Sequence, residues 1–330
     1  MVNGHDLHWM SPRAPEPPAG RGSHKVITRA FLTASQIGPL EVSDGRRHQW
    51  HVGAVYTSDG LLERESRRHG ALFGDLLRSL DQESTDPTAV GEELPGAWYY
   101  GGTWFEMFGH FIVETLPHLW LHDGQLPVIW HRHGDPPIHA FQRELLKLAG
   151  VEGEPRFATT ATVVERLVVP ARPVAMNSWI APQAQLVWQR VASRVKAAEP
   201  HRRVFLSRRQ YEENHAADRR REESFLDEVF ASLGFEVWSP ESLSPSEQIR
   251  LIRESLLIAG VEGSALHLTA FARPGTHVMM LGSSRAWKGN RVQPLIDGVN
   301  GNKLAIIPYL NERREHATIR AMISGVLAKI

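Results

Sequence analysis

The feature that most constrains the fold is an alternation of short apolar runs and helical patterns between Arg203 and Gly282. Strands that alternate with helices predict a parallel sheet with right-handed crossovers. The runs that have the length and composition of buried strands are Val204–Leu206, Phe235–Trp238, Leu257–Val261 and Thr276–Leu281. This stretch is therefore predicted to be an α/β unit.

Helix start and stop signals lie between these runs. Ser244 is predicted to be an N-cap, with Pro245 at the first helical position and Glu247 closing a capping box. Gly234 can supply a left-handed C-cap for the preceding helix. A further helix is predicted to begin at Ser264.

Two strand ends of this predicted sheet carry chemistry that suits a phosphate. Open parallel sheets bind ligands at the carboxyl ends of their strands. Paired guanidiniums match phosphate oxygens, and a glycine at a helix N-terminus lets backbone N–H groups approach an anion. The residues concerned are Ser207, Arg208 and Arg209 after the first strand, and Glu262, Gly263 and Ser264 after the third. Together they predict a diphosphate site for a nucleotide.

His110 and Glu114 form a second candidate site. They are four residues apart, so on a helix they share one face. A histidine oriented by a carboxylate is a suitable general base near neutral pH. The alternative is a hydrogen-bonded histidine near the core with no role in chemistry.

Four segments resemble the glycosyltransferase 61 family, in its bacterial polysaccharide-biosynthesis branch. They are GHFIVETLP from Gly109, FLSRR from Phe205, GFEVWSPESLSPSEQI from Gly234 and AGVEGSALHLTAFARPG from Ala259. They follow one another over roughly residues 100–281. The chain departs from the family pattern at Glu262, where many members have histidine, and at Leu268, where several have asparagine.

The resemblance implies an α/β fold of GT-B type, with two Rossmann-like domains facing a cleft. Residues 1–24 are rich in Pro and Gly over Ser11–Gly22 and are predicted to be a disordered tail. Residues 25–180 would form the N-terminal acceptor-side domain. Within this range the sequence pattern predicts helices over Leu61–Leu80 and over Ile138–Leu148, the second with Gly150 as its stop. Residues 181–330 would form the nucleotide-sugar-binding domain, with a terminal helix that packs back across the first domain.

The resemblance also implies an inverting glycosyltransferase that takes a nucleotide sugar, such as a UDP-hexose, UDP-N-acetylhexosamine or UDP-pentose. The acceptor would be a hydroxyl of a glycan, lipid-linked or on a protein, on the cytoplasmic side, with peripheral attachment to the membrane as an option. His110 or Glu114 would be the base, and Arg208 and Arg209 would hold the diphosphate. The further donor contacts expected are Ser207, Glu241, Glu262, Gly263, Ser264 and His267.

No metal or other cofactor is expected. A metal-dependent transferase usually needs a D-x-D cluster, and none occurs in the chain. The arginines can stabilise the departing diphosphate instead. His131 and His133, with His110, His118 and His122, are the alternative metal-binding group, but no H-E-x-x-H occurs.

Composition and missing motifs narrow the other function classes. The chain has 37 Lys and Arg against 37 Asp and Glu, so its net charge of zero gives no electrostatic reason to expect nucleic acid. Cysteine is absent, which fits a reducing compartment. The chain contains no G-x-G-x-x-G, which disfavours a nucleotide-dependent oxidoreductase. A non-catalytic nucleotide-sugar binder acting as a scaffold is the alternative to the transferase.

Overall fold

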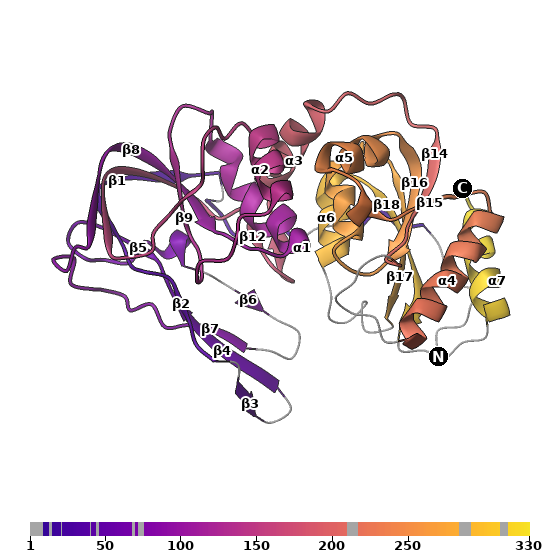
Figure 1. The fold of residues 1–330 in the computed structure, drawn as a ribbon, viewed down its shortest axis with the longest axis horizontal. Coiled ribbons are helices and arrows are strands. Elements are labelled where there is room, and N and C mark those ends of the chain that lie inside the picture. Colours follow the sequence, from indigo (N-terminus) through magenta and orange to yellow (C-terminus); the bar gives the residue numbers. More distant parts are fainter. Residues whose placement is uncertain are drawn as a thin grey trace. The chain divides into compact units, whose positions relative to one another are not determined.

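A computed structural model describes most of the chain as two compact units (Figure 1). The described residues are 9–12, 15–20, 22–39, 41–43, 46–67, 70–71, 76–209, 217–283, 292–310 and 316–330. The N-terminal unit comprises Pro15–Arg190, and the C-terminal unit comprises Val191–Ile330 together with Met1–Ala14. The division falls within helix α3 (Pro182–Ser193), about ten residues after the boundary expected from the sequence.

The C-terminal unit is built on a five-stranded sheet in which every neighbouring pair is parallel. Its order is β15-β14-β16-β17-β18. The strands are β14 (Arg202–Leu206), β15 (Glu236–Trp238), β16 (Ser255–Val261), β17 (His277–Ser283) and β18 (Lys303–Leu310). The four strands expected from the apolar runs are all present. The order 2-1-3-4-5 creates a topological switch point between β14 and β16, where ligands of such sheets bind.

Helices cover both faces of this sheet (Figure 1). They are α4 (Ala217–Ser232), α5 (Pro245–Arg253), α6 (Val292–Asn300) and α7 (His316–Leu327), with the 3-10 turns η5 (Pro240–Ser242) and η6 (Leu266–Phe271). The predicted capping box is confirmed, because Ser244 Oγ accepts from the Glu247 N–H at 3.3 Å and the Glu247 carboxylate accepts from the Ser244 N–H at 2.8 Å. Gly234 has the left-handed φ of 80° expected of a C-cap glycine.

The terminal helix α7 belongs to the core of its own unit. Ile319, Ile323 and Val326 are buried in the same apolar cluster as Phe205 and Phe230, which stack 4.2 Å apart. The prediction that this helix packs back across the first domain stays a prediction. Within its own unit, the apolar face of α7 covers the sheet alongside α4.

Part of the predicted disordered tail also packs on the C-terminal unit. Met10 exchanges both backbone hydrogen bonds with Leu304 at 2.9 Å, and Trp9 Nε1 donates to the Val326 carbonyl at 3.1 Å. The Trp9 ring also meets His277 edge to face. The disorder expected for residues 1–24 is thus wrong for Trp9 and Met10. The Trp9 indole packs against the core of the unit, and Met10 pairs with the edge strand β18.

The N-terminal unit has a mixed sheet instead of the expected parallel Rossmann-like one. Its order is β10-β9-β8-β11-β1-β5, and β1 is antiparallel to both of its neighbours. The strands are β1 (His24–Leu32), β5 (Val55–Tyr56), β8 (Glu92–Thr103), β9 (Val128–His131), β10 (Arg156–Phe157) and β11 (Thr162–Pro170). The antiparallel part lies at the β1 end of the sheet, where β5 and β11 both run against β1, whereas β8 is parallel to β9 and β11.

A second sheet takes the place of the helix predicted over Leu61–Leu80. That region contains the 3-10 turn η1 (Arg64–Ser66), β6 (Gly70–Ala71) and β7 (Leu76–Ser79). The second sheet has the order β2-β4-β7-β6, with β3 paired to β4. Its remaining strands are β2 (Gln36–Ile37), β3 (Glu41–Ser43) and β4 (Arg46–Val52). The described part of the chain contains no helix long and apolar enough to cross a membrane.

The rest of the N-terminal unit is helical or forms short strands. Helix α2 (Ala140–Ala149) ends at Gly150, whose φ of 92° confirms the predicted stop. A small hairpin of β12 (Val174–Ala175) and β13 (Trp179–Ile180) leads into α3. A continuous helical segment between β8 and β9 changes type twice: α1 (Phe108–His110), the π-helical η2 (Phe111–Thr115) and the 3-10 η3 (Leu116–Leu121).

Candidate functional site

The change of helix type between β8 and β9 places the predicted His110 and Glu114. The Leu116 N–H bonds to the Phe111 carbonyl, five residues back, which defines the π-helical turn. Pro117 has no N–H to continue the ladder, so the hydrogen-bond pattern must change there, and the segment continues as a 3-10 helix. π-helical turns are rare and are often found at functional sites.

The two predicted catalytic side chains are in contact. His110 Nδ1 lies 2.5 Å from Glu114 Oε1. Both side chains are partly exposed, at 27% for His110 and 14% for Glu114. With Nδ1 held by the carboxylate, the ring is fixed in orientation, and Nε2 is the nitrogen left to exchange a proton with a substrate.

The position of the His110 ring is also fixed by stacking against Phe105, whose backbone is itself held by hydrogen bonds. The Phe105 ring stacks on it, with centroids 5.3 Å apart and an interplanar angle of 26°. The Phe105 backbone is held on both sides, because its N–H donates to Thr115 Oγ1 and its carbonyl accepts from Gln142 Nε2, each at 3.1 Å. This packing holds His110 and Glu114, which we call the dyad, in one geometry before any substrate arrives.

Helix α3 supports the same segment from behind. Trp188 Nε1 donates to the Ile112 carbonyl at 2.9 Å, within the π-helical turn. The Arg190 guanidinium donates to the carbonyls of Leu119, Trp120 and His122 at 3.2, 3.2 and 2.7 Å. Carbonyls at a helix end have no partners within the helix, so this arginine caps the segment that carries the dyad.

A small cavity lies beside Glu114. The space open to the centre of a water molecule is about 20 Å³, enough for about one water. It is lined by Ser66, Gly102, Thr103, Phe105, Glu114, His118, Arg172 and Val174, all in the N-terminal unit. No sequence pattern points to Arg172, and His118 is expected only as one of the alternative metal-binding histidines.

His118 is a buried wall of this cavity. Its ring lies on the backbone of Gly102, where a built Cβ would come within 2.7–2.8 Å of three ring atoms. Gly102 also has a φ of 80°, a conformation that favours glycine. Burial, and to a lesser degree the nearby Arg172 charge, lower the pKa of His118 to about 3, so its imidazole is neutral at physiological pH.

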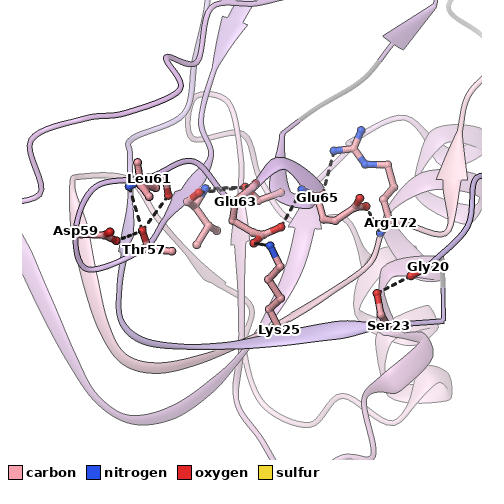
Figure 2. A network of polar contacts seen from close by, with 11 residues as sticks. Gly20, Ser23, Lys25, Thr57, Asp59, Leu61, Glu63, Glu65 and Arg172 are labelled. Atoms are coloured by element: carbon pink, nitrogen blue, oxygen red, sulfur yellow. Dashed lines mark hydrogen bonds and ion pairs between the residues drawn. The ribbon is translucent and has the colours of Figure 1, made fainter.

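Arg172 is held by the chain that precedes β6 (Figure 2). Its backbone N–H donates to the Glu65 carboxylate at 3.1 Å, and its guanidinium donates to the Glu65 carbonyl at 3.3 Å. Glu63 in turn accepts from the Glu65 N–H at 3.2 Å and pairs with Lys25 Nζ at 2.6 Å. The network links β1 and η1 to Arg172, which is only 6% exposed.

The remaining histidines of the alternative metal group have other partners. His131 is buried between Tyr100 Oη at 2.7 Å and the Thr33 carbonyl at 2.9 Å, and burial lowers its pKa to about 4. His122 Nε2 lies 2.8 Å from the Leu126 carbonyl, and His133 Nδ1 lies 3.0 Å from Ser35 Oγ. Within the described residues, no group of three or more His, Asp or Glu side chains is arranged to hold a metal ion.

In the C-terminal unit, Ser207 lies at the end of β14. Its side chain is buried, and its hydroxyl accepts from the Arg209 N–H at 3.2 Å and donates to the Asp227 carboxylate. Its own N–H donates to the Trp238 carbonyl at 2.8 Å. The expected contact between this hydroxyl and a diphosphate stays a prediction. Ser207 fixes the turn at the end of β14 and so aims the two arginines that follow.

The loops after β14 and β16 meet at the switch point of the sheet. A Cβ on Gly263 would lie 3.0 Å from Arg208 Nη1, and Gly263 has a φ of 145°. The missing side chain thus leaves room for the guanidinium beside the backbone. Arg208 is half-buried and Arg209 is exposed. Two of the predicted donor-binding features are brought together here.

The helix expected from Ser264 is wrong in length and type. The chain after Gly263 forms tight turns, with the Leu266 N–H bonded to the Gly263 carbonyl at 3.0 Å and the His267 N–H to the Ser264 carbonyl at 3.2 Å. It continues as the six-residue η6, in which five residues are buried. A segment packed on several sides has no single amphipathic stripe to favour a long helix. Such a short segment has little macrodipole, so attraction of an anion rests on the arginines.

The other predicted donor contacts lie around the carboxyl edge of the same sheet. Glu262 follows β16, is half-buried, and its N–H donates to the Leu281 carbonyl at 2.9 Å. His267 is half-buried in η6, and Ser264 is exposed just before it. Glu241 is exposed on η5, after β15.

A buried polar network lies under η6. Asp297 of α6 accepts from Thr269 Oγ1 at 3.0 Å, Asn302 Nδ2 at 2.8 Å and Gln293 Nε2 at 2.9 Å. Asn300 Nδ2 adds bonds to the Thr269 and Ala272 carbonyls. Burial raises the pKa of Asp297 to about 6, against the lowering effect of its three donors. The network ties η6 to α6 and so fixes the segment that follows Gly263.

Comparison with known proteins identifies the family. None of the curated proteins compared with the chain matches it. The model of the family described as Glycosyltransferase 61 matches residues 108–279. The match begins two residues before His110 and ends in β17, so it takes in the dyad, the arginines after β14 and the loop after β16. Because it covers more than half of the 330 residues, the chain belongs to the glycosyltransferase 61 family and is a glycosyltransferase.

Proposed function

We propose that the chain is an inverting, metal-independent transferase that moves a sugar from a UDP-sugar to a hydroxyl of a glycan, lipid-linked or protein-linked acceptor. The observation that carries the proposal is the contact of His110 with Glu114 at 2.5 Å in a π-helical turn. Inversion in a single displacement needs a base that removes the acceptor proton as the oxygen attacks the anomeric carbon. A carboxylate–imidazole pair of this geometry can do that.

The C-terminal unit supplies the donor side of this proposal. Arg208 and Arg209 follow β14 at the switch point, and Arg208 lies beside the backbone of Gly263. A departing diphosphate gains negative charge, and guanidiniums placed there in advance stabilise it without a metal ion. Glu241 and Glu262 are proposed to accept hydrogen bonds from base or sugar hydroxyls, and His267 to reach the phosphates.

For the whole chain we propose the GT-B type, with the parallel unit as the donor domain. A crystal structure with UDP bound tests this. Catalysis on the cytoplasmic face of a membrane, with the chain attached peripherally, belongs to the same proposal and is tested by fractionation of cells that express the chain with and without a high-salt wash.

The first experiment is calorimetric titration of the protein with a panel of nucleoside diphosphates, with and without EDTA. UDP binding that survives EDTA supports the metal-independent transferase, and it selects the UDP-sugars to test for turnover. Binding that EDTA abolishes would replace the arginine site by a metal site. No binding of any nucleotide would remove the Arg208 region from the donor site.

A non-catalytic nucleotide-sugar binder is separated from the transferase by donor hydrolysis. Transferases commonly transfer their sugar slowly to water when no acceptor is present. Release of UDP from a bound UDP-sugar, lost when Glu114 is replaced by glutamine, supports catalysis. Tight UDP-sugar binding with no release over hours supports the scaffold.

A further inference from the structure

The cavity beside Glu114 is lined by His118, a histidine with a buried ring nitrogen. His118 is 8% exposed, and its Nδ1 is buried without a hydrogen-bond partner among the residues that the structure describes. Nearly all buried polar atoms in folded proteins have a partner, because leaving one unpaired costs about 1–3 kcal/mol. His118 Nδ1 lies over Gly102, and both residues line the cavity. A guest in the cavity is the natural partner.

The fold keeps this imidazole in place at some cost. A residue other than glycine at position 102 would clash with the ring and would also be strained at a φ of 80°. The carbonyl of His118 is fixed as well, because it accepts from Tyr99 Oη at 2.7 Å. A histidine that only filled space would not need a glycine beneath it.

The walls of the cavity define what the guest must be. Ser66 is already engaged, since its Oγ accepts from the Val55 N–H at 2.8 Å and donates to the Glu63 carbonyl at 2.7 Å. The other polar residues that line the cavity are Thr103 and three residues with larger polar groups: the carboxylate of Glu114, the guanidinium of Arg172 and the imidazole of His118. A guest between a carboxylate and a guanidinium must donate to one and accept from the other. A hydroxyl group does both, whereas an anion only accepts and an ammonium only donates.

We propose that this cavity is the subsite for the reacting hydroxyl of the acceptor, with His118 and Arg172 as its binding residues. The inference rests on the proposed function. Room for about one water means that one oxygen enters, while the remainder of the acceptor lies outside. Without an acceptor, a water molecule occupies the subsite.

The subsite selects between the two candidate bases. An oxygen held there is next to Glu114, which lines the cavity, whereas His110 does not. The O–H bond of the acceptor breaks and its proton passes to the Glu114 carboxylate. The oxygen electron pair forms the new bond to the anomeric carbon, and the bond from that carbon to the diphosphate breaks with its electron pair leaving on the phosphate oxygen. His110 is then a positioning residue that orients Glu114 through the 2.5 Å contact.

The neutral state of His118 fits this task. Burial and the Arg172 charge lower its pKa to about 3, so the ring carries no charge to compete with Glu114 for the proton. The surrounding titratable groups are Glu114 on η2 and Arg172 before β12, and both line the same cavity. Arg172 supplies the one fixed positive charge among the lining residues, and it can stabilise the developing alkoxide.

A first test needs no activity. A crystal structure of the wild-type protein, grown without glycerol or other alcohols, should show an ordered water within hydrogen-bonding distance of both His118 Nδ1 and the Glu114 carboxylate. A cavity without electron density at that point would overturn the proposal, whatever the chain does with UDP-sugars.

The second test uses water as the acceptor. With a UDP-sugar that the wild-type protein hydrolyses, His118→Phe keeps a ring and removes its nitrogens. We expect hydrolysis to fall by about tenfold or more, the loss of one hydrogen bond to the reacting oxygen, while the Kd for UDP stays within about twofold. His118→Asn, which offers a polar atom close to the Nδ1 position, should recover most of the lost rate.

A matched control is His122→Phe. His122 is buried and follows His118 by four positions in the sequence. It bonds to the Leu126 carbonyl at 2.8 Å and does not line the cavity. It should lower the melting temperature without changing the rate of the folded fraction. Wild-type hydrolysis in His118→Phe would overturn the subsite. If the wild-type protein binds no UDP, the proposed function fails, and the crystal structure alone decides whether the cavity holds an oxygen.

Discussion

The two units of this glycosyltransferase supply different kinds of chemistry. In the C-terminal unit, guanidiniums and backbone stand at the edge of a parallel sheet, where Arg208 lies against Gly263. In the N-terminal unit, an imidazole and a carboxylate sit in a π-helical turn, and a neutral imidazole and a buried guanidinium line the cavity next to them. We propose that the C-terminal unit offers fixed positive charge to the donor and that the N-terminal unit offers the groups that exchange protons.

The difference shows two ways of making a site. The parallel sheet brings its loops together through strand order alone, because β14 and β16 are neighbours and their ends point the same way. In the mixed sheet, β10, β9, β8 and β11 are also parallel to one another, and the segment that carries His110 and Glu114 follows the carboxyl end of β8. There the site depends on local departures from regular structure: the π-helical turn, the positive φ of Gly102 and the shifted register between β8 and β9.

The largest effect should come from the dyad. We expect His110→Ala to lower turnover by about 10²–10⁴, because Glu114 loses the ring that orients it and shares its proton. The Kd for UDP should stay near the wild-type value, since the arginine site belongs to the other unit. The measurement pairs steady-state kinetics with calorimetry on the same preparation.

The matched control for His110→Ala is His139→Ala, in which a histidine of the same unit at the start of α2 is replaced. It should leave turnover unchanged in the folded protein. Loss of UDP binding in His110→Ala would break the division of tasks, because it would make His110 a donor ligand.

The buried carboxylate of the C-terminal unit should affect stability instead of chemistry. The pKa of Asp297 is raised to about 6 in the folded state, above the value of 3.8 for an unperturbed aspartate. The folded state therefore binds more protons between these values. The Asp297 contribution to the free energy of unfolding is most favourable below about pH 4, falls as the pH rises to about 6, and is constant above that. The loss amounts to at most about 3 kcal/mol.

Urea denaturation across pH 4–7 measures this effect. Asp297→Asn should flatten the pH dependence relative to the wild-type protein, whereas Glu241→Gln, which changes an exposed carboxylate of the same unit, should not. An unchanged slope in Asp297→Asn would mean that the three donors keep the carboxylate charged in the folded state at all of these pH values.

The arginine site should affect affinity. We expect Arg208→Ala to weaken UDP binding by about 1.5–3 kcal/mol, the range for a hydrogen bond to a charged group. Arg203→Ala is a matched control, because Arg203 is an exposed residue of the same strand near its amino end. Equal losses from the two substitutions would show that UDP responds to net charge and not to the crevice at the carboxyl edge.

Strand periodicity and capping residues could be predicted from the sequence wherever local pattern and final packing agree. The strands from β14 to β17 have apolar runs with clear breaks, and Ser244 and Glu247 form their capping box. His110 and Glu114 could be paired because their spacing works in any helix. The family match over residues 108–279 rests on the same segments.

Other parts could not be predicted because they depend on long-range partners. Arg172 is fixed by Glu65, which is 107 positions away, and no local pattern indicates that contact. The helix expected over Leu61–Leu80 has helical spacing, yet most of that chain pairs as strands or forms a turn. Ser207 is predicted to bind a ligand, and no local pattern indicates its hydrogen bond with Asp227, which lies 20 positions away.

The smallest effect separates backbone strain from the cost of keeping His118 in its cavity. Gly102→Ala and Gly96→Ala both place a methyl group on a left-handed residue of β8, with φ of 80° and 78°. Nothing lies within 4 Å of a Cβ at position 96, whereas one at position 102 would come within 2.8 Å of the His118 ring.

Strain alone should cost each variant about 1–2 kcal/mol of unfolding free energy. We expect Gly102→Ala to lose about 1 kcal/mol more and also to slow donor hydrolysis, because the ring must move away from the Glu114 cavity. Equal losses of unfolding free energy in the two variants, with unchanged hydrolysis, would show that hydrolysis does not need the present position of the His118 ring. The site of the N-terminal unit would then not depend on the local distortion at Gly102, and the contrast with the C-terminal unit would fail at this residue.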